Sequence, residues 1–427
     1  MSASGDNSLP NVSSPVSLRK NFVWTFAGNL VNAGSQWALI VILAKRTSPE
    51  AVGQFAYALA VTTPIMLFAS LKLRSAQATD QRHEYLFVEY WSLRLLTTIM
   101  ALAVILVFGL ANRSSHGMGW VIVLVGVAKG VESLSDIFYG LFQKQERMDL
   151  IAHSMILRGL VTVAIAIVVL SFTDRVVAVA ACLLFSWTVV LLTFDIPKAR
   201  RLLGDSFGLF PIWSNSRLRQ LVVLTLPLGA SIAVGSLYNN IPRYVIEHRL
   251  GVHDLGIFSA LAYFMLFGGM IFTALAQSVI PRMARYHAQG EKKGFRNIFT
   301  KLISAGFALG LLGVVVAILA GDRIIALIYD EQYAIHSRLL VLLMIAGFID
   351  ITFLGIASAV NAMRFFRIQF FVSIISVLVV TISSITLVNS FGINGVAIAM
   401  AVTKTTEAII YMIILRKLSY RFYEFAR

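Results

Sequence analysis

Long runs of apolar residues recur along nearly the whole chain, and they constrain its fold more than any other feature. A helix crosses the bilayer core with about 20 apolar residues, and hydrocarbon offers no partner to backbone groups outside a helix or a closed barrel. The runs therefore predict an all-α polytopic membrane protein. About twelve transmembrane helices are expected, near residues 21–44, 52–71, 88–111, 118–142, 152–172, 175–194, 219–241, 255–280, 298–320, 338–362, 366–388 and 393–416.

Composition excludes a water-soluble globular chain. Hydrophobic residues make up 58% of the sequence and charged residues 13%, and the mean hydropathy is +0.80. The net charge of +15 does not indicate a nucleic-acid partner, because most basic residues lie in short loops between spans, where they determine topology. The single cysteine, Cys182, lies in an apolar run, which excludes a disulfide framework and a cysteine metal site.

The distribution of Lys and Arg predicts the orientation of the chain. An even number of spans places both termini on one side. The tails and loops of that side carry 23 Lys and Arg, whereas the opposite loops carry 8. Because short loops rich in Lys and Arg are retained in the cytoplasm, both termini are predicted to be cytoplasmic.

One short segment occurs twice. Residues 46–55 and 249–258 both have arginine first, glycine seven positions later and phenylalanine at the end, and each joins the first two spans of one half of the chain. A shift of 203 positions superimposes them, which predicts two six-helix lobes related by a parallel pseudo-two-fold axis. Alternatively, the two loops solve the same turn independently. The glycine is expected to let the first helix of each lobe turn tightly into the second.

A segment rich in Arg, Gly and Pro separates the two halves and is typical of a linker. The predicted organisation is a disordered cytoplasmic tail at 1–17, an N-lobe at 18–194, a cytoplasmic linker at 195–218, a C-lobe at 219–418 and a cytoplasmic tail at 419–427.

Charged side chains inside spans are candidates for function, since each costs about 2.5–3.5 kcal/mol on insertion scales. In the fourth span, Lys129, Glu132, Ser133 and Asp136 fall within one arc of a helix and form a polar stripe. The alternative is that these residues only form ion pairs that hold the lobe together.

Four other spans contain charges. Lys404 and Glu407 share one face of the twelfth span, with the same two interpretations as the fourth-span stripe. Arg158 in the fifth span and Asp350 in the tenth are isolated in sequence and must find partners on other helices. Arg94 in the third span and Arg158 could instead extend toward the cytoplasmic interface.

The remaining charges lie near span ends. Arg243 and Glu247 follow the seventh span at i and i+4, where an interfacial ion pair is the alternative to a substrate contact. Lys72 and Arg74 end the second span and are interpreted as markers of its cytoplasmic boundary.

Three local patterns carry a resemblance to a known family. The turn 250–259, the stretch 139–147 that leaves the fourth span and the stretch 391–397 that enters the twelfth look like polysaccharide-export flippases of the multidrug/oligosaccharidyl-lipid/polysaccharide (MOP) exporter superfamily. The resemblance covers about residues 18–418. It implies movement of an undecaprenyl-diphosphate-linked oligosaccharide repeat unit from the cytoplasmic to the outer leaflet of the bacterial cytoplasmic (inner) membrane, by alternating access, for O-antigen, capsule or exopolysaccharide biosynthesis.

The implied partners are the lipid-linked oligosaccharide, membrane lipids, and a polysaccharide polymerase with its export machinery. Because a diphosphate in hydrocarbon needs positive partners, the charges in and near the spans divide into two roles. Substrate binding is assigned to Lys129, Arg158, Arg243 and Lys404, and charge pairing or ion coupling to Glu132, Asp136, Glu247, Asp350 and Glu407.

Two other classes of protein are alternatives. An ion-coupled drug antiporter of the same superfamily often carries an acidic residue in its first span, and residues 21–44 contain none, although Glu132, Asp136 or Asp350 could couple ions instead. A membrane-bound glycan polymerase or ligase needs a large outer loop, and the outer loops are short. Histidines do not cluster and phosphate-loop spacing is absent, so no catalytic residue, cofactor or metal is predicted.

Overall fold

The computed structural model describes residues 18–424, apart from 81, 83, 113–116, 205–206, 214 and 364–365. Every regular element in this part of the chain is helical. In order they are α1 (Leu18–Arg46), α2 (Pro49–Ala69), α3 (Leu73–Thr79), α4 (Phe87–Ala111), α5 (Met118–Lys144), α6 (Met148–Val169), α7 (Val176–Val190), the π-helical turn η1 (Leu191–Asp195), α8 (Ile196–Leu203), α9 (Asn215–Leu250), α10 (Val252–Ala288), α11 (Lys292–Ile328), α12 (Glu331–Ala334), α13 (Ser337–Ala362) and α14 (Phe366–Glu424).

The described residues make twelve crossings. Ten helical segments are long and apolar enough to span a membrane. The helix α5, with 27 residues, is also long enough to span a membrane, but it carries the charged stripe. The helix α14 is two helices, because Gly392 interrupts it with φ of 56° and ψ of −138°, a conformation that glycine adopts readily. The predicted all-α fold is confirmed.

Several helices extend beyond the predicted spans. The seventh span was expected near 219–241, but α9 continues to Leu250. The sixth was expected to end at 194, but α7 runs through η1 into α8 and ends at Leu203, so the predicted linker begins inside a continuous helix. Hydropathy marks where hydrocarbon ends, whereas a helix ends where its backbone hydrogen bonds end.

The two lobes have the same internal packing. In the first, α4 packs on α5, α2 packs on α5 and α2 touches α4. In the second, α11 packs on α13, α10 packs on α13 and α10 touches α11. Each of these contacts joins the corresponding spans of its lobe, so the predicted two-lobe repeat is confirmed.

The two repeated segments meet where α2 packs against α10. A methyl group at Gly53 would overlap with the carbonyl oxygen of Val252, and one at Gly256 with the carbonyl oxygen of Pro49. Each glycine therefore faces the residue four positions before the glycine of the other repeat. The predicted close approach exists, but it joins the two lobes and does not tighten the turn within each lobe. We call these four residues the α2–α10 junction.

Polar contacts surround the α2–α10 junction. His253 Nδ1 lies 2.6 Å from Glu50 Oε1, and these two positions are equivalent under the 203-residue shift. Farther along the interface, Trp37 donates to the hydroxyl of Tyr329 at 3.0 Å. Lys45 donates to a carbonyl oxygen of α11 at 2.8 Å. These contacts close one end of the molecule.

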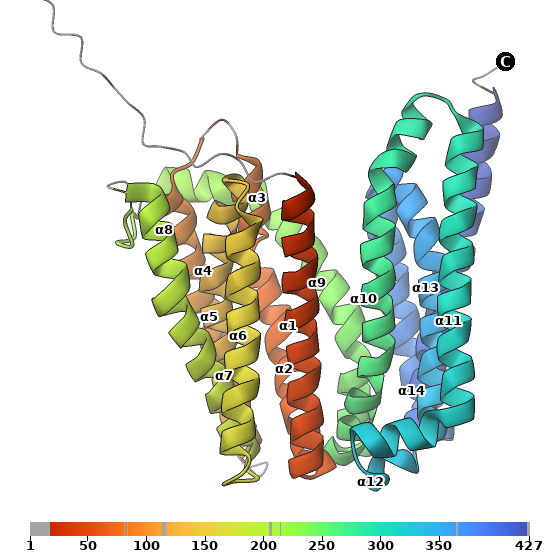
Figure 1. The fold of residues 1–427 in the computed structure, drawn as a ribbon, viewed down its shortest axis with the longest axis horizontal. Helices are drawn as coiled ribbons and strands as arrows, with labels where there is room; N and C mark the ends of the chain where they lie inside the picture. The colour runs from red at the N-terminus through yellow and green to blue at the C-terminus, as the bar shows by residue number, and fades with distance from the viewer. Residues whose placement is uncertain are drawn as a thin grey trace, which may run out of the picture.

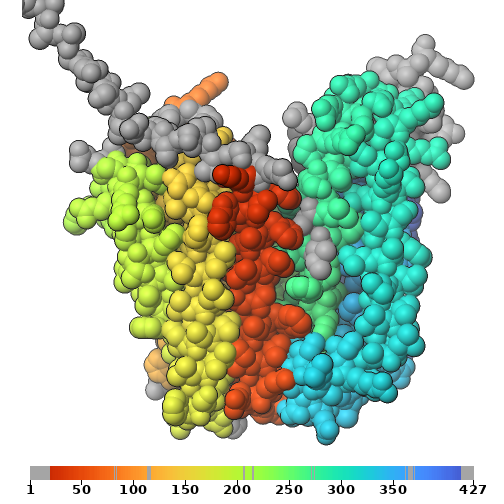
Figure 2. All heavy atoms as spheres, in the orientation of Figure 1, coloured from red at the N-terminus to blue at the C-terminus, as the bar shows by residue number. Residues whose placement is uncertain are grey.

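The lobes diverge toward the opposite end, where α1 begins and α14 ends (Figure 1). The space-filling view shows a hollow between α1 and α10 that widens toward the same end (Figure 2). The molecule is therefore closed at the α2–α10 junction and open on the side of its two termini.

We expect Gly53→Ala to loosen the α2–α10 junction, because the added methyl group meets the backbone oxygen of Val252, which cannot rotate away. Overpacking of this kind costs about 1–3 kcal/mol. The measurement is the yield of the disulfide between cysteines placed at Glu50 and His253, which should fall several-fold.

The matched control is Gly34→Ala on α1, where an added methyl group meets nothing within 4 Å. Both proteins carry Cys182→Ser, since this buried cysteine is the only native one. Equal disulfide yields in the two variants would contradict the assigned role of Gly53.

Candidate functional site

The polar stripe of α5 faces a cavity of about 420 Å³ in the first lobe. Helices α2 to α6 form most of the wall, with Asn32 from α1 and Ile232 from α9, so the cavity lies against the second lobe. Five cations and two carboxylates line it, an excess of three positive charges. The charged residues are Lys72, Arg74, Arg94, Lys129, Arg158, Glu132 and Asp136.

Glu132 is the first of two anionic centres in the cavity. Lys129 Nζ donates to it at 2.8 Å, and Arg158 Nη2 lies 3.0 Å from its other oxygen. Both cations also approach the ring of Trp187, at 5.5 Å for Lys129 and 4.6 Å for Arg158. The predicted pairing of Lys129 with Glu132 is confirmed. Arg158 finds its partner on another helix, as expected, and does not extend to the interface.

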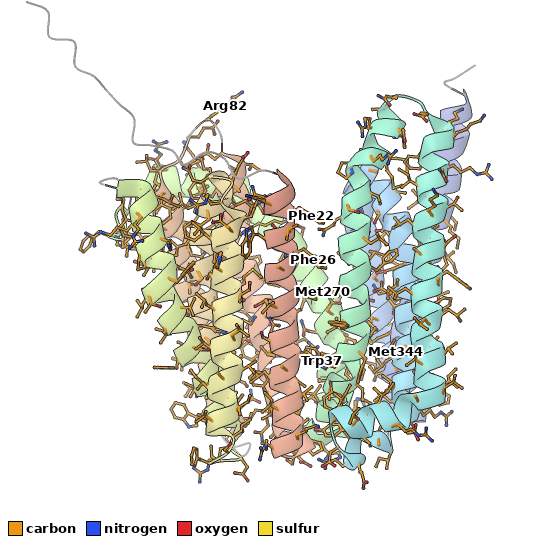
Figure 3. All side chains as sticks on the ribbon, in the orientation of Figure 1. Phe22, Phe26, Trp37, Arg82, Met270 and Met344 are labelled. Carbon is orange, nitrogen blue, oxygen red and sulfur yellow. The ribbon has the colours of Figure 1, made fainter. Side chains whose placement is uncertain are left out.

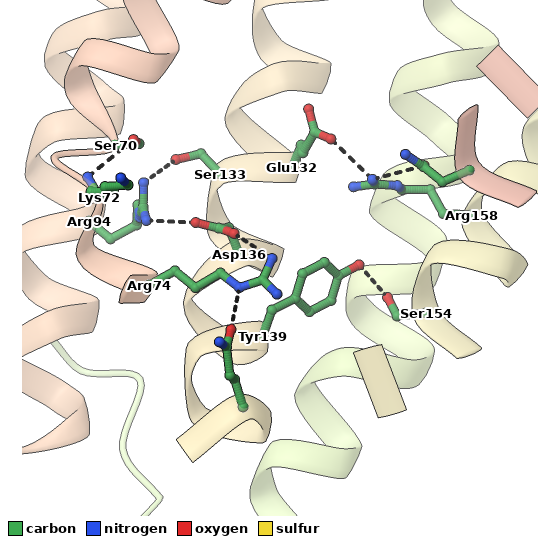
Figure 4. A network of polar contacts seen from close by, with 12 residues as sticks. Ser70, Lys72, Arg74, Arg94, Glu132, Ser133, Asp136, Tyr139, Ser154 and Arg158 are labelled. Carbon is green, nitrogen blue, oxygen red and sulfur yellow. Dashed lines mark hydrogen bonds and ion pairs between the residues drawn. The ribbon is translucent and has the colours of Figure 1, made fainter. Parts of the chain in front are cut away.

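Asp136 is the second anionic centre (Figure 4). Arg94 donates to it at 3.0 Å and Arg74 at 3.4 Å. Arg94, which is completely buried, also donates to Ser133 at 3.2 Å. The alternative in which Arg94 extends to the interface is wrong, because its acceptors lie inside the lobe.

Lys72 and Arg74 were interpreted as boundary markers, but both line the cavity. After α2 ends, Leu71 and Lys72 adopt φ of 47° and 54°, and the chain turns back as α3 along α5. This turn places Arg74 above the ring of Tyr139 at 5.5 Å and within 3.1 Å of the Gln143 amide oxygen. Left-handed backbone at residues other than glycine costs about 1–3 kcal/mol and clusters at functional sites. The sequence, in which basic residues simply follow an apolar run, gives no indication of this left-handed turn.

The loop after α3 holds this helix in place. Asp80 accepts hydrogen bonds from the backbone of Glu84 and Tyr85, and Lys144 lies 3.8 Å away. Burial alone would raise the pKa of Asp80, but these donors and Lys144 outweigh it and hold the pKa below its usual value. Asp80 therefore stabilises the loop at neutral pH, and its contribution is lost as the pH falls through the lowered pKa.

The second lobe has a smaller cluster around Lys404. Its ammonium lies 3.0 Å from Asp350 and 3.1 Å from Glu407, and 4.6 Å from the ring centre of Tyr238. The predicted pairing of Lys404 with Glu407 is confirmed, and Asp350 finds its partner on α14. Since two carboxylates surround one cation, this cluster has an excess of one negative charge.

Arg243 lies apart from both clusters. Its guanidinium donates to Asn240 at 3.0 Å, and its buried Nε has no hydrogen-bond partner. No ion pair joins it to Glu247 in the described part of α9, so the predicted i, i+4 pair is wrong. The helix continues to Leu250, and Arg243 turns toward Asn240, one turn back along it. The side chain of Glu247 is left without an ion-pair partner among the described residues.

Comparisons with known proteins decide the family. The family model described as "Polysaccharide biosynthesis protein" matches residues 18–287. The chain belongs to this polysaccharide biosynthesis protein family. The MatE family model also matches, at residues 227–387.

A relative of this family member is the capsular polysaccharide biosynthesis protein CapF from Staphylococcus aureus. The two are 25% identical over 397 residues, which cover 92% of this chain and 98% of CapF.

Two solved structures share its fold. The lipid II flippase MurJ in an inward closed conformation has a TM-score of 0.74 at 13% identity, over 93% of this chain and 87% of MurJ. A multidrug resistance MATE family transporter of the MOP superfamily in its inward-facing conformation has a TM-score of 0.69 at 14% identity, over 92% of this chain and 96% of that one. This polysaccharide biosynthesis protein is thus a multi-pass membrane protein with the two-lobe MOP fold.

We expect Arg94→Ala to destabilise the protein by about 3 kcal/mol, the lower end of the range for breaking a buried ion pair. The lower end applies because Asp136 is partly exposed and keeps Arg74 as a partner. The measurement is the thermal unfolding midpoint of the purified protein. The matched control, Arg82→Ala, removes an exposed arginine from the α3–α4 loop and should leave the midpoint unchanged. Equal midpoints for Arg94→Ala and the control would contradict this role.

Proposed function

We propose that this polysaccharide biosynthesis protein is a flippase. Its substrate is an undecaprenyl-diphosphate-linked oligosaccharide repeat unit, moved from the cytoplasmic to the outer leaflet of the bacterial cytoplasmic membrane for surface polysaccharide biosynthesis. The observation that carries the proposal is the cavity with an excess of three positive charges inside a membrane lobe. A diphosphate is the kind of group that such a cavity favours, because buried charges need opposite charges and hydrogen bonds.

Three of the cations keep donors for an anion. Arg158 has two guanidinium nitrogens, Nε and Nη1, that are buried without a hydrogen-bond partner. Lys129 is held at Glu132, and an ammonium has three donors. Lys72 lines the cavity and makes no ion pair within the described residues. We assign the diphosphate to Lys72, Lys129 and Arg158, whereas Arg94 mainly positions Asp136.

The lipid chain needs a different environment from the diphosphate. A second cavity, of about 360 Å³, lies between α1 and α10, and Phe22, Phe26, Leu30 and Met270 form part of its wall. Figure 3 shows Phe22, Phe26 and Met270 in the gap between the two lobes. In our proposal the prenyl chain stays in the bilayer through this gap while the head group occupies the basic cavity.

The shape of the molecule supports alternating access as the mechanism. With both termini cytoplasmic, the open end faces the cytoplasm and the α2–α10 junction closes the outer end. Release to the outer leaflet then requires the lobes to separate at this junction and to close at the opposite end. A polymerase and export machinery would receive the flipped repeat unit.

The second candidate is an ion-coupled small-molecule antiporter. The acidic cluster of Asp350 and Glu407 around Lys404 would suit ion coupling. However, a cationic cargo would be repelled by the excess positive charge of the first-lobe cavity. The charge of the cavity therefore favours the flippase.

Deletion of the gene in its host should leave lipid-linked repeat units in the cytoplasmic leaflet and remove the surface polysaccharide. The measurement is the extraction of lipid-linked saccharides together with their accessibility to an enzyme added from outside. Normal surface polysaccharide with altered drug sensitivity would support the antiporter instead.

Lys129→Gln should weaken binding of farnesyl diphosphate by about tenfold or more, as expected for loss of a charge-assisted hydrogen bond. The fold should tolerate the change, because Glu132 keeps Arg158 at 3.0 Å. Arg82→Gln removes the same charge outside the cavity and serves as the control. If both variants bind like the wild type at normal protein levels, Lys129 only pairs with Glu132.

A further inference from the structure

Asp195 is a buried carboxylate outside the cavity. It ends the π-helical turn η1, its exposed fraction is 0%, and neither of its oxygens has a hydrogen-bond partner within the described residues. An isolated carboxylate in a low-dielectric interior is far more costly as an anion than as a neutral acid. π-helical turns insert an extra residue and are frequent at functional sites. Asp195 makes no ion pair among the described residues, and it does not line the cavity proposed to bind the head group.

Hydroxyl groups connect Asp195 to the cavity. The side chains of Ser135 on α5 and Ser154 on α6 lie beside the carboxylate. Ser154 is completely buried, and its hydroxyl is 2.7 Å from that of Tyr139 (Figure 4). Tyr139 in turn lines the cavity. Hydroxyl groups rotate and both donate and accept, so Tyr139 and Ser154 can relay a proton toward Asp195 when the Ser154 hydroxyl turns from Tyr139 to the carboxylate.

We propose that Asp195 is a proton-binding site, loaded and emptied from the cavity through Tyr139 and Ser154, and coupled through Arg158 to the anion in the cavity. On loading, a hydronium ion in the cavity gives a proton to the oxygen of Tyr139 and becomes water, Tyr139 passes its own proton to Ser154, and Ser154 passes its own to Asp195. Each hydroxyl regains a proton, and the carboxylate becomes a neutral acid. Emptying reverses these transfers.

Arg158 provides the coupling. The charged and titratable groups that act on Asp195 are Arg158 on α6 and Tyr139 on α5. An ionised Asp195 attracts the guanidinium and lowers the positive potential at the cavity. A neutral Asp195 leaves the charge of Arg158, whose Nε and Nη1 have no hydrogen-bond partner, available to an anion. Anion binding and proton binding therefore favour each other, as linkage requires.

The proton site is tested directly by infrared spectroscopy on the full-length protein in lipid, without substrate. The wild type should show a carboxylic-acid band that disappears as the pH rises and that is missing in Asp195→Asn, which keeps the shape and neutral charge of the protonated acid. Ser154→Ala should retain the band but slow its shift after transfer to deuterated water. If the spectra of wild type and Asp195→Asn titrate identically, the proposal is wrong.

The coupling is tested with farnesyl diphosphate as the probe, and this arm rests on the proposed function. Affinity of the wild type should fall about fivefold or more as the pH rises, the usual lower range of coupling between sites. The probe becomes more anionic with rising pH, which acts in the opposite direction. Asp195→Asn should bind farnesyl diphosphate as tightly as the wild type does at low pH, and its affinity should not fall as the pH rises.

The two ideas fail in different ways. A decline of equal size in Asp195→Asn would overturn the coupling through Asp195 while leaving the flippase intact. Absence of farnesyl diphosphate binding in the wild type would count against the flippase and also overturn the coupling to an anion, whereas the infrared band would still decide whether Asp195 binds a proton.

Discussion

The cost of placing charge inside hydrocarbon organises the first lobe. Glu132 and Asp136, one turn apart on α5, hold cations from α3, α4, α5 and α6. Removing either carboxylate would leave cations without partners, which costs more than the pair itself contributes. The same arrangement leaves an excess of three positive charges, because five cations and two carboxylates line the cavity. A lobe assembled from balanced pairs would have no charge left for a substrate, whereas this lobe keeps its excess facing a cavity.

The two lobes repeat one helical scaffold but differ in charge. The packing of α4, α5 and α2 in the first lobe is repeated by α11, α13 and α10 in the second. In place of a basic cavity, the second lobe has Lys404 between Asp350 and Glu407, with an excess of one negative charge. A scaffold fixed by apolar packing leaves the polar face of each inner helix free to differ. In the proposed flippase, the first lobe would attract an anionic head group and the acidic cluster of the second would repel it.

Apolar run length and local spacing were enough to predict the membrane helices, the two lobes and the pairs that Lys129 and Lys404 make three residues along their own helices, because these depend on residues close in sequence. Contacts between different helices were harder to predict from the sequence. Arg158 and Asp350 needed partners that no pattern could identify, and Arg74 reaches the cavity only because Leu71 and Lys72 adopt left-handed backbone without a glycine to signal it. Asp195 was missed for a similar reason, since a π-helical turn has no sequence rule and moves its last residue into the lobe. The failed pair of Arg243 and Glu247 shows the converse: correct spacing does not form a pair when Asn240 offers a nearer acceptor.

The proposed alternating access requires the lobes to separate at the α2–α10 junction. Glu50 and His253 are each about half exposed, at 51%, and a polar contact between two such side chains contributes about 1 kcal/mol or less. Most of the attraction therefore comes from packing. Gly53 and Gly256 let the two backbones approach closely, and Phe55 and Phe258 are buried in an apolar core that both helices share. Separating a junction held by buried ion pairs would leave charges unpaired, whereas parting Gly53 from Val252 and Gly256 from Pro49 leaves no charge without a partner.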